Sequence, residues 1–528
     1  MRALLTVVLL APTFAAAQVP YERVRDATSE PQSWLSYSGD YTAQRHSTLD
    51  RIDRDNVSEL QPAWIYQIEA RDAFQATPLV ADGVMYISEP PSDVTALDLK
   101  TGRPLWTYRR SLPEEIITCC GRVNRGVALL DDQVILGTID AHLVALDAAT
   151  GRVRWDVKVA DHHEAYSITV APLALDGKVI VGIAGGEFGI RGFLDAYDAE
   201  TGERLWRFWT VPGPGEPGHE TWSGDSWKSG AAATWITGAY DPELNLVYWG
   251  TGNPGPDFLG DSRQGDNLYS DAVIALDADT GELRWHFQFT PHDVLDMDSC
   301  QVPVLLNAEF KGSPRKLMLF PNRNGFYYIL DRATGEYLLG REFAKQNWAL
   351  RLDANGRPVK NPDAIPDADG AVAFPDDDGT ANWMSPTYSP ATGLIYVAIR
   401  EKGAYFFKTE AEYAPGQLFM GASKRQLEDQ EVKGYIRALD ALTGERVWDF
   451  ELHTPPWAGL LSTAGGLVFS GSEEGEFFAL DAATGDVLWS FQTGGRVIAA
   501  PISYLSEGKQ YIAVAAGGSL MTFVLERE

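Results

Sequence analysis

A motif of the form aliphatic or Tyr–Asp, two residues, Thr–Gly, three residues, Trp recurs through this chain and constrains its fold more than any other feature. Complete copies begin at Leu97, Leu146, Tyr197, Leu276, Leu439 and Leu480, and a further copy at Leu330 carries Leu339 in place of Trp. The Asp and the Thr–Gly pair suit a tight turn, in which Gly takes a positive φ. Each copy therefore predicts strand, turn and strand, and so many copies indicate a repeat architecture.

Another short β-rich run precedes each copy, so one repeat predicts about four antiparallel strands, which is a propeller blade. A single blade cannot bury both of its faces, so the Trp is expected to pack between neighbouring blades. With a degenerate copy at Trp64, the series predicts an all-β, eight-bladed β-propeller with Trp-docking repeats. Seven blades is the alternative if Trp64 is not part of the series. Wider spacings predict insertions, whose long loops are expected on one face, at residues 211–228, 361–378 and 402–433.

Charge and the N-terminal sequence restrict where such a chain works. Lysine plus arginine number 44 and aspartate plus glutamate 73, so the net charge of −29 excludes a general nucleic-acid binder and argues against adsorption to anionic lipid. A basic start, the apolar run 3–10 and an Ala15-Ala16-Ala17 site predict a secretory signal peptide over residues 1–17. That run is too short to span a bilayer, and no membrane span is expected elsewhere. We expect one domain, residues 18–528, in an oxidising compartment to which the signal peptide directs it.

Hard oxygen ligands follow equivalent strands of the predicted blades. Glu187 and Asn253 each come directly after a β-run of successive repeats, so they should face the same central space. Asp296 and Asp298 lie just past the Trp285 strand and, in an extended chain, would point the same way. Each residue alone is more simply a solvated or capping residue of a loop. Together they predict a metal site of the kind that calcium or a larger trivalent ion prefers.

The chain has three cysteines, and two of them are adjacent. A bridge between Cys119 and Cys120 would form a strained ring and close almost no loop, so its plausible use is a rigid local platform. Two buried free thiols would be the expectation in a cytosolic chain, and the bridge is the expectation in an exported one. Cys300 is expected to be an inert buried thiol. No C-x-x-C-H is present, so no covalently attached c-type haem is expected.

Several motifs taken together resemble those of the pyrroloquinoline quinone (PQQ) dependent methanol/ethanol dehydrogenase family. The segments that carry the resemblance are 119–126, 185–189, 251–256, 291–298, 323–326 and 457–459. The resemblance extends from about residue 32 to the C-terminus, and it implies an eight-bladed periplasmic propeller. Three positions depart from the family pattern. They are Gln75, where the family usually has Glu, Ala184, where it has Ser, and Leu295, where it has Trp. The change at Leu295 is expected to open or reshape the pocket, so the substrate need not be methanol.

The resemblance implies a site for PQQ, a flat tricarboxylate, together with one metal ion. The residues that it places around the cofactor are Cys119, Cys120, Arg125, Thr169, Gly185, Gly186, Trp235, Asn382 and Trp457. The cysteine ring would cover one face of PQQ, Trp235 would stack on the other, and Arg125 and Thr169 would contact its carboxylates. The implied metal ligands are Glu187, Asn253, Asp296 and Asp298.

The resemblance also implies a reaction. Asp296 is similar to the catalytic base, and Arg323 to the cation beside the reactive carbonyl. Lanthanide-using members carry a second Asp two residues past the base, as Asp298 is here, whereas calcium-using members carry a small residue. Asp298 therefore favours a lanthanide over calcium.

The implied function is oxidation of a primary alcohol to an aldehyde in the periplasm. Hydride would pass to the quinone, and electrons would pass to a separate soluble cytochrome c, because the chain carries no haem motif. One alternative is a non-enzymatic periplasmic propeller scaffold, which would share the repeat but need neither the metal site nor the cysteine pair. Another is a quinoprotein for sugars or polyols. For the assembly, a homodimer is one open alternative.

Overall fold

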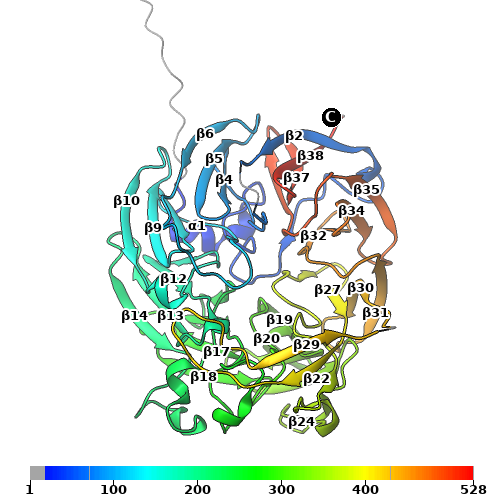
Figure 1. Ribbon diagram of the computed structural model, residues 1–528. Coiled ribbons are helices and arrows are strands. Elements are labelled where there is room, and N and C mark those ends of the chain that lie inside the picture. Colours follow the sequence, from blue (N-terminus) through cyan, green and yellow to red (C-terminus); the bar gives the residue numbers. More distant parts are fainter. Residues whose placement is uncertain (1–17, 70–71, 429, 527–528) are drawn as a thin grey trace, which may run out of the picture.

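The structure is a computed structural model that describes residues 18–69, 72–428 and 430–526. The predicted signal peptide, residues 1–17, lies outside the described residues. The described chain has an all-β, propeller-like fold, in which antiparallel sheets follow one another around a common centre (Figure 1). No helix in the described ranges is long and apolar enough to cross a membrane.

Five sheets of the described chain have four strands that follow one another in sequence. These sheets are β3 (Leu79–Ala81), β4 (Val84–Glu89), β5 (Asp93–Asp98) and β6 (Pro104–Tyr108); β7 (Ala128–Leu130), β8 (Gln133–Gly137), β9 (His142–Asp147) and β10 (Val153–Lys158); β11 (Leu173–Leu175), β12 (Lys178–Gly182), β13 (Phe193–Asp198) and β14 (Arg204–Trp209); β15 (Ala239–Asp241), β16 (Leu246–Gly250), β17 (Ala272–Asp277) and β18 (Leu283–Gln288); and β19 (Val304–Phe310), β20 (Ser313–Pro321), β21 (Phe326–Asp331) and β22 (Tyr337–Glu342).

The remaining large sheets combine strands that are more distant in sequence. One contains β26 (Thr387–Ser389), β27 (Leu394–Glu401), β30 (Lys433–Asp440) and β31 (Arg446–Leu452). A five-stranded sheet contains β1 (His46–Ser47), β32 (Leu461–Thr463), β33 (Leu467–Gly471), β34 (Glu476–Asp481) and β35 (Val487–Gln492). The last sheet contains β2 (Leu60–Gln67), β38 (Ser519–Leu525), β37 (Lys509–Ala516) and β36 (Ile502–Ser506).

Two smaller sheets and short helices decorate this core. The smaller sheets are β23 (Ala349–Leu352) with β24 (Pro358–Lys360), and β25 (Ala371–Ala373) with β28 (Ala404–Lys408) and β29 (Ala422–Gln426). The α-helix is α1 (Tyr21–Arg25), and the 3₁₀ helices are η1 (Ala27–Ser29), η2 (Val57–Glu59), η3 (His162–Glu164), η4 (Gly186–Phe188), η5 (His219–Thr221), η6 (Ser226–Ser229), η7 (Gly260–Ser262) and η8 (Pro362–Ala364). The insertions predicted around 361–378 and 402–433 therefore contain strands of their own, and the one at 211–228 contains 3₁₀ turns.

The two ends of the chain meet in one sheet. Strand β2 pairs antiparallel with β38, with Leu60 opposite Leu525, so an N-terminal strand completes a sheet whose other strands are C-terminal. Figure 1 shows β2, in blue, beside the red β37 and β38. The Nε1–H of Trp489, on the preceding sheet, donates to the carbonyl of Leu60 at 3.1 Å.

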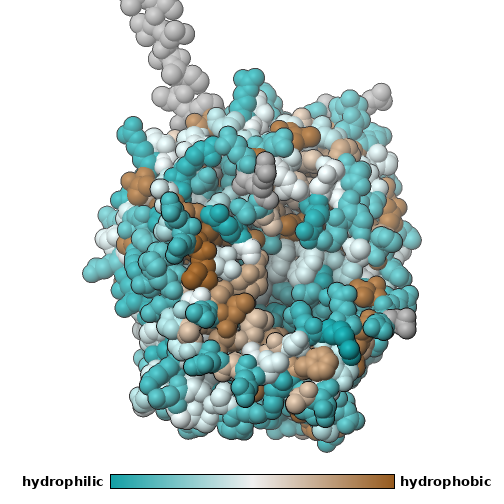
Figure 2. All heavy atoms as spheres, in the orientation of Figure 1, coloured by the Kyte–Doolittle hydropathy of each residue, from teal (hydrophilic) through white to brown (hydrophobic). Residues whose placement is uncertain are grey.

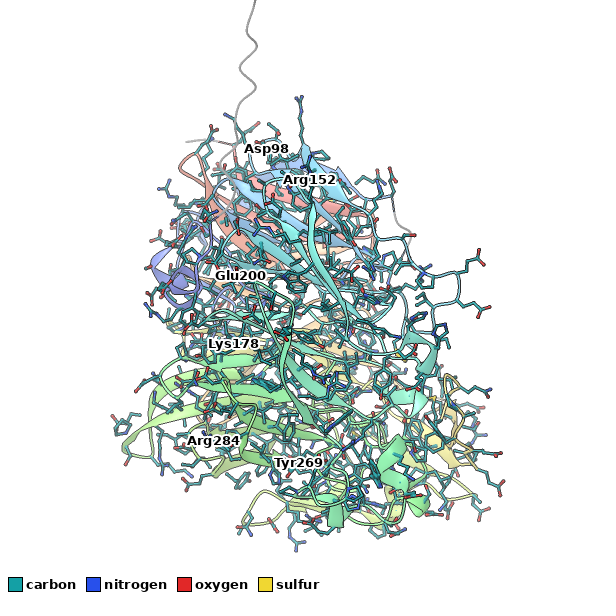
Figure 3. All side chains as sticks on the ribbon, turned by 90° about the vertical axis from the view of Figure 1, so that its left-hand side faces the viewer. Asp98, Arg152, Lys178, Glu200, Tyr269 and Arg284 are labelled. Atoms are coloured by element: carbon teal, nitrogen blue, oxygen red, sulfur yellow. A yellow bond between two sulfur atoms is a disulfide. The ribbon has the colours of Figure 1, made fainter. Side chains whose placement is uncertain are left out.

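The repeated turn is built by its own side chains. The carboxylate of Asp98 accepts hydrogen bonds from the Thr101 N–H at 2.8 Å and from the Thr101 hydroxyl at 2.6 Å. Gly102 follows with φ +68°, the left-handed conformation that favours glycine. Figure 3 shows Asp98, Arg152 and Glu200, from the turns of three successive sheets, one above the other.

The motif tryptophans contact the turn of the next sheet. The Nε1–H of Trp106 donates to the Ala148 carbonyl at 3.0 Å, and a side chain at Gly151 would lie 2.4 Å from the Trp106 ring. The same bond recurs in Trp64 to Leu99, Trp155 to Ala199, Trp206 to Ala278, Trp285 to Arg332 and Trp448 to Ala482. Where Leu339 replaces the Trp, the hydroxyl of Tyr327 donates to the Ala441 carbonyl at 2.7 Å.

We expect Trp206→Ala to lower the free energy of unfolding by about 3–5 kcal/mol, because it removes a buried ring from between two sheets. Trp206→Phe, which keeps a ring and loses the bond to Ala278, should cost about 1 kcal/mol. Guanidinium unfolding followed by fluorescence would measure both. The matched control is Leu205→Ala, because Leu205 is 47% exposed. An equal loss in the control and in Trp206→Ala would contradict the prediction.

Candidate functional site

The site is a cavity of about 520 Å³ at one end of the sheets. Two kinds of connection form its walls. One kind joins the last strand of a sheet to the first strand of the next sheet, and the other joins the second strand of a sheet to the third strand of the same sheet. In antiparallel sheets both kinds emerge at the same end, whereas the Asp–Thr–Gly turns lie at the other end. Figure 2 shows the face of the molecule seen in Figure 1, hollowed near its centre.

All residues that the sequence placed in the site line this one cavity. Their positions are Cys119, Cys120 and Arg125 between β6 and β7; Thr169 between β10 and β11; Gly185, Gly186 and Glu187 after β12; Trp235 before β15; Asn253 after β16; Asp296 and Asp298 between β18 and β19; Arg323 after β20; Asn382 before β26; and Trp457 between β31 and β32. The repeat thus predicted the shared location of Glu187 and Asn253, and the family resemblance predicted most of the other residues of the cavity wall.

Asp298 has several partners at the cavity wall. Its carboxylate accepts hydrogen bonds from the Asn253 backbone N–H at 2.8 Å and from Trp235 Nε1–H at 3.2 Å. It also forms an ion pair with Arg323, Nη1 to Oδ2, at 2.6 Å. Asp298 thus joins three walls of the cavity.

The segment that carries Asp296 is not extended, and the expectation that it would be is wrong. Residues 289–303 contain no strand, and Asp296 has φ 59° in the left-handed region, which is uncommon for a residue other than glycine. The buried carboxylate of Asp293 shapes the turn by accepting the Leu295 N–H at 2.9 Å and the Met297 N–H at 2.7 Å. This turn brings Asp296 to the cavity beside Asp298.

Arg323 is fixed between two walls. Its guanidinium lies 3.3 Å from Asp296 and also donates to the backbone carbonyl of Asp377. A Cβ at Gly379, which has φ +73°, would lie 1.9 Å from Arg323 Cγ, so only glycine permits this approach. The negative charges of Asp296 and Asp298 raise the pKa of Arg323 in spite of its burial. The guanidinium therefore stays charged beside both carboxylates.

The acidic groups of the cavity are short of positive charge. Burial, reinforced by the charge of Asp298, raises the pKa of Glu187 to about 7. Burial also raises the pKa of Asp296, and the facing Arg323 only partly opposes it. Such carboxylates become stable as anions when a cation lies among them. Within the described chain, the carboxylate oxygens of Glu187, Asp296 and Asp298 do not all lie within 4.8 Å of one another. The three groups therefore line a common space without converging on one point.

A second region of the cavity suits a planar anionic ligand. Arg125 donates to the Thr169 hydroxyl at 3.0 Å, and its guanidinium lies 5.1 Å from the Trp235 ring and 5.3 Å from the Trp383 ring. Its Nε has no hydrogen-bond partner although it is buried. A buried guanidinium with a free N–H and aromatic neighbours is a natural partner for a carboxylate on a flat molecule.

The adjacent cysteines are joined, as predicted. A disulfide links Cys119 and Cys120, and both residues are exposed at the mouth of the cavity. Cys120 Sγ lies 3.7 Å from a Glu187 carboxylate oxygen. Cys300 is a free thiol and is buried, also as predicted. The bridge thus forms one wall directly above the acidic groups.

Sequence reasoning missed several residues of this region. Asp377, Asp378, Trp383, Met420 and Arg496 line the cavity from long connections that carry no recognisable motif. Asp257 is fully buried behind Asn253, and its position four residues after Asn253 was the only signal that could have found it.

The three departures from the family pattern differ in their position. Gln75 and Ala184 line the cavity, and the carbonyl oxygen of the Gln75 side chain is buried without a partner. Leu295 lies in the hydrophobic core and does not line the cavity, so whether this replacement of Trp opens or reshapes the pocket stays a prediction.

The residues present fit both a hard metal ion and a quinone tricarboxylate. Glu187, Asp296 and Asp298 supply carboxylates and Asn253 an amide, which is the donor set of calcium or a lanthanide. Asn253 Nδ2, Arg125 Nε and Arg323 Nε are buried without partners, which indicates that the surroundings of these groups are completed by a ligand. The cavity also has the volume of a typical cofactor site.

Comparison with known proteins identifies the family of the chain. The family model "Glucose/ethanol/alcohol dehydrogenase, beta-propeller domain", of the PQQ group, matches residues 34–345, and a model for outer membrane protein assembly factor BamB matches residues 432–525. The chain is 41% identical to quinoprotein alcohol dehydrogenase PedH of Pseudomonas putida, over 95% of this chain and 89% of that protein. It is 38% identical to the quinohemoprotein alcohol dehydrogenase of Comamonas testosteroni, over 95% of this chain and 75% of that one.

Solved structures of alcohol and methanol dehydrogenases are similar to the whole described fold. The crystal structure of the Comamonas testosteroni quinohemoprotein superposes with a TM-score of 0.93 at 35% identity, covering 97% of this chain and 83% of that one. A europium-containing methanol dehydrogenase superposes with a TM-score of 0.90 at 33% identity, covering 96% of this chain and all of the other, 100%.

The thiol inventory gives a direct test of the cysteine arrangement. Denatured, unreduced protein should take up one equivalent of iodoacetamide, at Cys300, and reduced protein should take up three. Intact-mass spectrometry would count the labels. In the Cys300→Ser variant, unreduced labelling should vanish. Three labels on freshly isolated, unreduced protein would show that the vicinal bridge is absent.

Proposed function

The chain belongs to the PQQ-dependent alcohol dehydrogenase family, and on this premise we propose that it oxidises a primary alcohol to an aldehyde with PQQ and one metal ion. One observation carries the proposal. A single cavity contains the acidic donor set, the paired Asp296 and Arg323, and the Arg125 region beside the vicinal disulfide. A scaffold needs none of these groups, so the alternative of a non-enzymatic propeller accounts for the repeat alone.

The fold-level part of the proposal is a closed, single-domain propeller of eight blades over residues 18–528, docked by the motif tryptophans. The seven four-stranded sheets and the one five-stranded sheet of the described chain support the count. The recurring bonds from Trp Nε1 to the next turn support the docking. Long loops on the cavity face would then shape the mouth.

PQQ would be held in the part of the cavity near Arg125. The disulfide of Cys119 and Cys120 would form one wall against its ring and Trp235 the opposite wall. Arg125 and Thr169 would bind its carboxylates, with Asn382, Trp457 and the backbone of Gly185 and Gly186 completing the enclosure. When bound, PQQ supplies an acceptor for the hydride that leaves the alcohol carbon.

The chain's own residues would handle the proton and the charge. The carboxylate of Asp296 would take the proton from the substrate hydroxyl, which is the work of a general base. Arg323, 3.3 Å away, would orient that carboxylate and keep a positive charge beside the reacting carbonyl. Asp298, which Arg323 also contacts, would limit how far the guanidinium can move.

The metal would be held by Glu187, Asn253, Asp296 and Asp298. Three carboxylates sum to −3, which a trivalent lanthanide balances better than calcium does. The likeness to a europium-containing methanol dehydrogenase supports this choice. The remaining walls, which include Met420, Trp383 and Ile498, would limit the size of the alcohol.

Partners and location complete the proposal. No haem-attachment motif is present in the sequence, so a separate soluble cytochrome c would accept the electrons. The predicted signal peptide and the vicinal disulfide both suit the periplasm. Sugars and polyols are the alternative substrates, and a homodimer is the alternative to a monomer.

Asp296→Asn should keep PQQ bound and lower turnover by roughly 10²–10⁴-fold, because it removes the base and preserves its size. Turnover would be measured with an artificial dye acceptor over a panel of alcohols, and bound PQQ by its absorbance. The matched control is Asp378→Asn, which alters a carboxylate of the cavity wall that faces Arg400. Near-normal turnover in Asp296→Asn would remove Asp296 from the role of base.

Lanthanum should support more activity than calcium in the wild type, because Asp298 brings the site to −3. Asp298→Asn keeps an acceptor for the Asn253 N–H, so it tests the charge with little change in shape. We expect this variant to lose most of its preference for lanthanum and to retain weak activity with calcium. Equal activity of the wild type with both ions, or an unchanged preference in the variant, would show that Asp298 does not select the ion.

A further inference from the structure

One of the insertions reaches the cavity through a segment without regular structure. Residues 409–421, here called the strap, connect β28 to β29 and contain no helix or strand. Leu418 is 61% exposed, Phe419 is 7% exposed, and Met420 lines the cavity. The strap therefore passes from solvent to the cavity wall over these consecutive residues.

Backbone hydrogen bonds fix the strap beside the acidic groups of the cavity. The Phe419 N–H donates to the Glu187 carbonyl at 2.7 Å, and the Phe258 N–H donates to the Met420 carbonyl at 2.8 Å. Glu187 is one of the carboxylates of the site, and Phe258 belongs to the loop that begins with Asn253. Met420 is therefore held between the two loops that carry oxygen donors.

The fit of the strap against these loops is close. A Cβ at Gly189 would lie 2.9 Å from Phe419 Cδ1, and a Cβ at Gly421 would lie 2.7 Å from Leu259 Cβ. A side chain at either glycine would push the strap away from the wall. The position of Met420 is thus determined by packing on both sides of it.

The loop that holds Met420 also contacts the turn of the proposed base. A Cβ at Gly260 would lie 2.9 Å from Val294 Cγ1, and Val294 precedes Asp296 in the same turn. Met420 is partly buried and packs against the hydrophobic cluster that contains Leu295. The wall that Met420 forms therefore adjoins the turn that carries Asp296.

The chemistry of this wall favours one kind of ligand. The carbonyl of Met420 is already bonded to Phe258, so its thioether side chain is what the residue offers to a ligand. A Met side chain is unbranched and adapts to apolar groups of different shape. It cannot replace the hydrogen bonds that a polyol or a sugar loses on leaving water. An alkyl chain, in contrast, gains from each methylene that leaves water.

We propose that Met420 is a specificity-determining residue, which makes the site select primary alcohols with an apolar chain over polyols and sugars. This inference rests on the proposed function. With the substrate hydroxyl at Asp296, the carbon chain would lie along the Met420 wall. Further hydroxyl groups on that chain would meet the thioether without a partner.

The expected size follows from the hydrophobic effect. Transfer of one methylene from water to an apolar environment is worth about 4-fold in affinity, so two methylenes against Met420 would be worth roughly 15-fold. Gln has nearly the length of Met and a polar end. Met420→Gln should therefore remove most of this gain while the wall keeps its size.

The first test measures specificity. Full-length protein loaded with PQQ and a metal ion is assayed with a dye acceptor on ethanol, 1-hexanol, 1-propanol and glycerol. We expect the wild type to have a higher kcat/KM for 1-hexanol than for ethanol, and for 1-propanol than for glycerol. Met420→Gln should lower the ratio of kcat/KM for 1-hexanol to that for ethanol about 10-fold. Met420→Leu, which stays apolar, should keep most of that ratio, and Met420→Ala replaces Met420→Gln if that variant does not fold.

The second test needs no turnover. The tertiary alcohol 2-methyl-2-heptanol, which cannot be oxidised to a carbonyl compound, is titrated calorimetrically into the protein with and without PQQ. Its affinity should fall about 10-fold in Met420→Gln, and the negative heat-capacity change of binding should become smaller.

Leu418→Gln is the matched control in both tests. It introduces the same polar side chain into the strap, at a residue that is 61% exposed and does not line the cavity of the described chain. Unchanged ratios in Met420→Gln, or an equal loss in Leu418→Gln, would overturn the role of Met420 while the proposed function stands. A preference of the wild type for glycerol over 1-propanol would overturn the substrate class. A wild type that oxidises no alcohol would overturn the proposed function, and the calorimetric titration would then still decide whether Met420 binds an alkyl chain.

Discussion

The contact between a tryptophan and the turn of the next sheet is the interaction on which the other features depend. Each four-stranded sheet has two apolar faces and covers neither alone, so each must pack against a neighbour. The ring of Trp206 and its bond to the Ala278 carbonyl show how one turn receives the side chain of the sheet before it. Because these turns occupy one end of the sheets, the other end is left for irregular connections. The functional groups accumulate there, on a scaffold that sets their spacing.

Much of this arrangement could be predicted from the sequence, because equivalent positions in the copies of a repeat occupy equivalent places in the fold. The Asp–Thr–Gly turns and the strand ends after 182 and 250 gave equivalent positions in successive sheets, so Glu187 and Asn253 could be placed in one space. The conformation around Asp296 could not be read in this way. It depends on the Asp293 carboxylate, which binds two backbone N–H groups, and such local competition leaves no periodic pattern. Asp257 was missed for a related reason, since a lone Asp in a loop is usually a solvated residue.

Charge is distributed unevenly in the cavity. Arg323 contacts Asp296 and Asp298, whereas the Glu187 carboxylate forms no ion pair among the described residues and lies 3.7 Å from the Cys120 sulfur. The protein thus neutralises one side of the acidic group and leaves the other to a ligand. Asp296 and Asp298 are therefore held in place by the Arg323 guanidinium in the protein alone.

The pairing of β2 with β38 has a consequence for how the molecule is made. Strand β2, near the start of the chain, can complete its sheet only after the residues of β38 have been synthesised. Contacts of such long sequence separation form late, and a chain that waits for them exposes unpaired strand edges. The cavity draws its walls from sheets made early and late, from Cys119 to Trp457 and Ile498. Assembly of the cofactor site is therefore a post-synthetic event, and truncation at the C-terminus would impair maturation before it impaired catalysis.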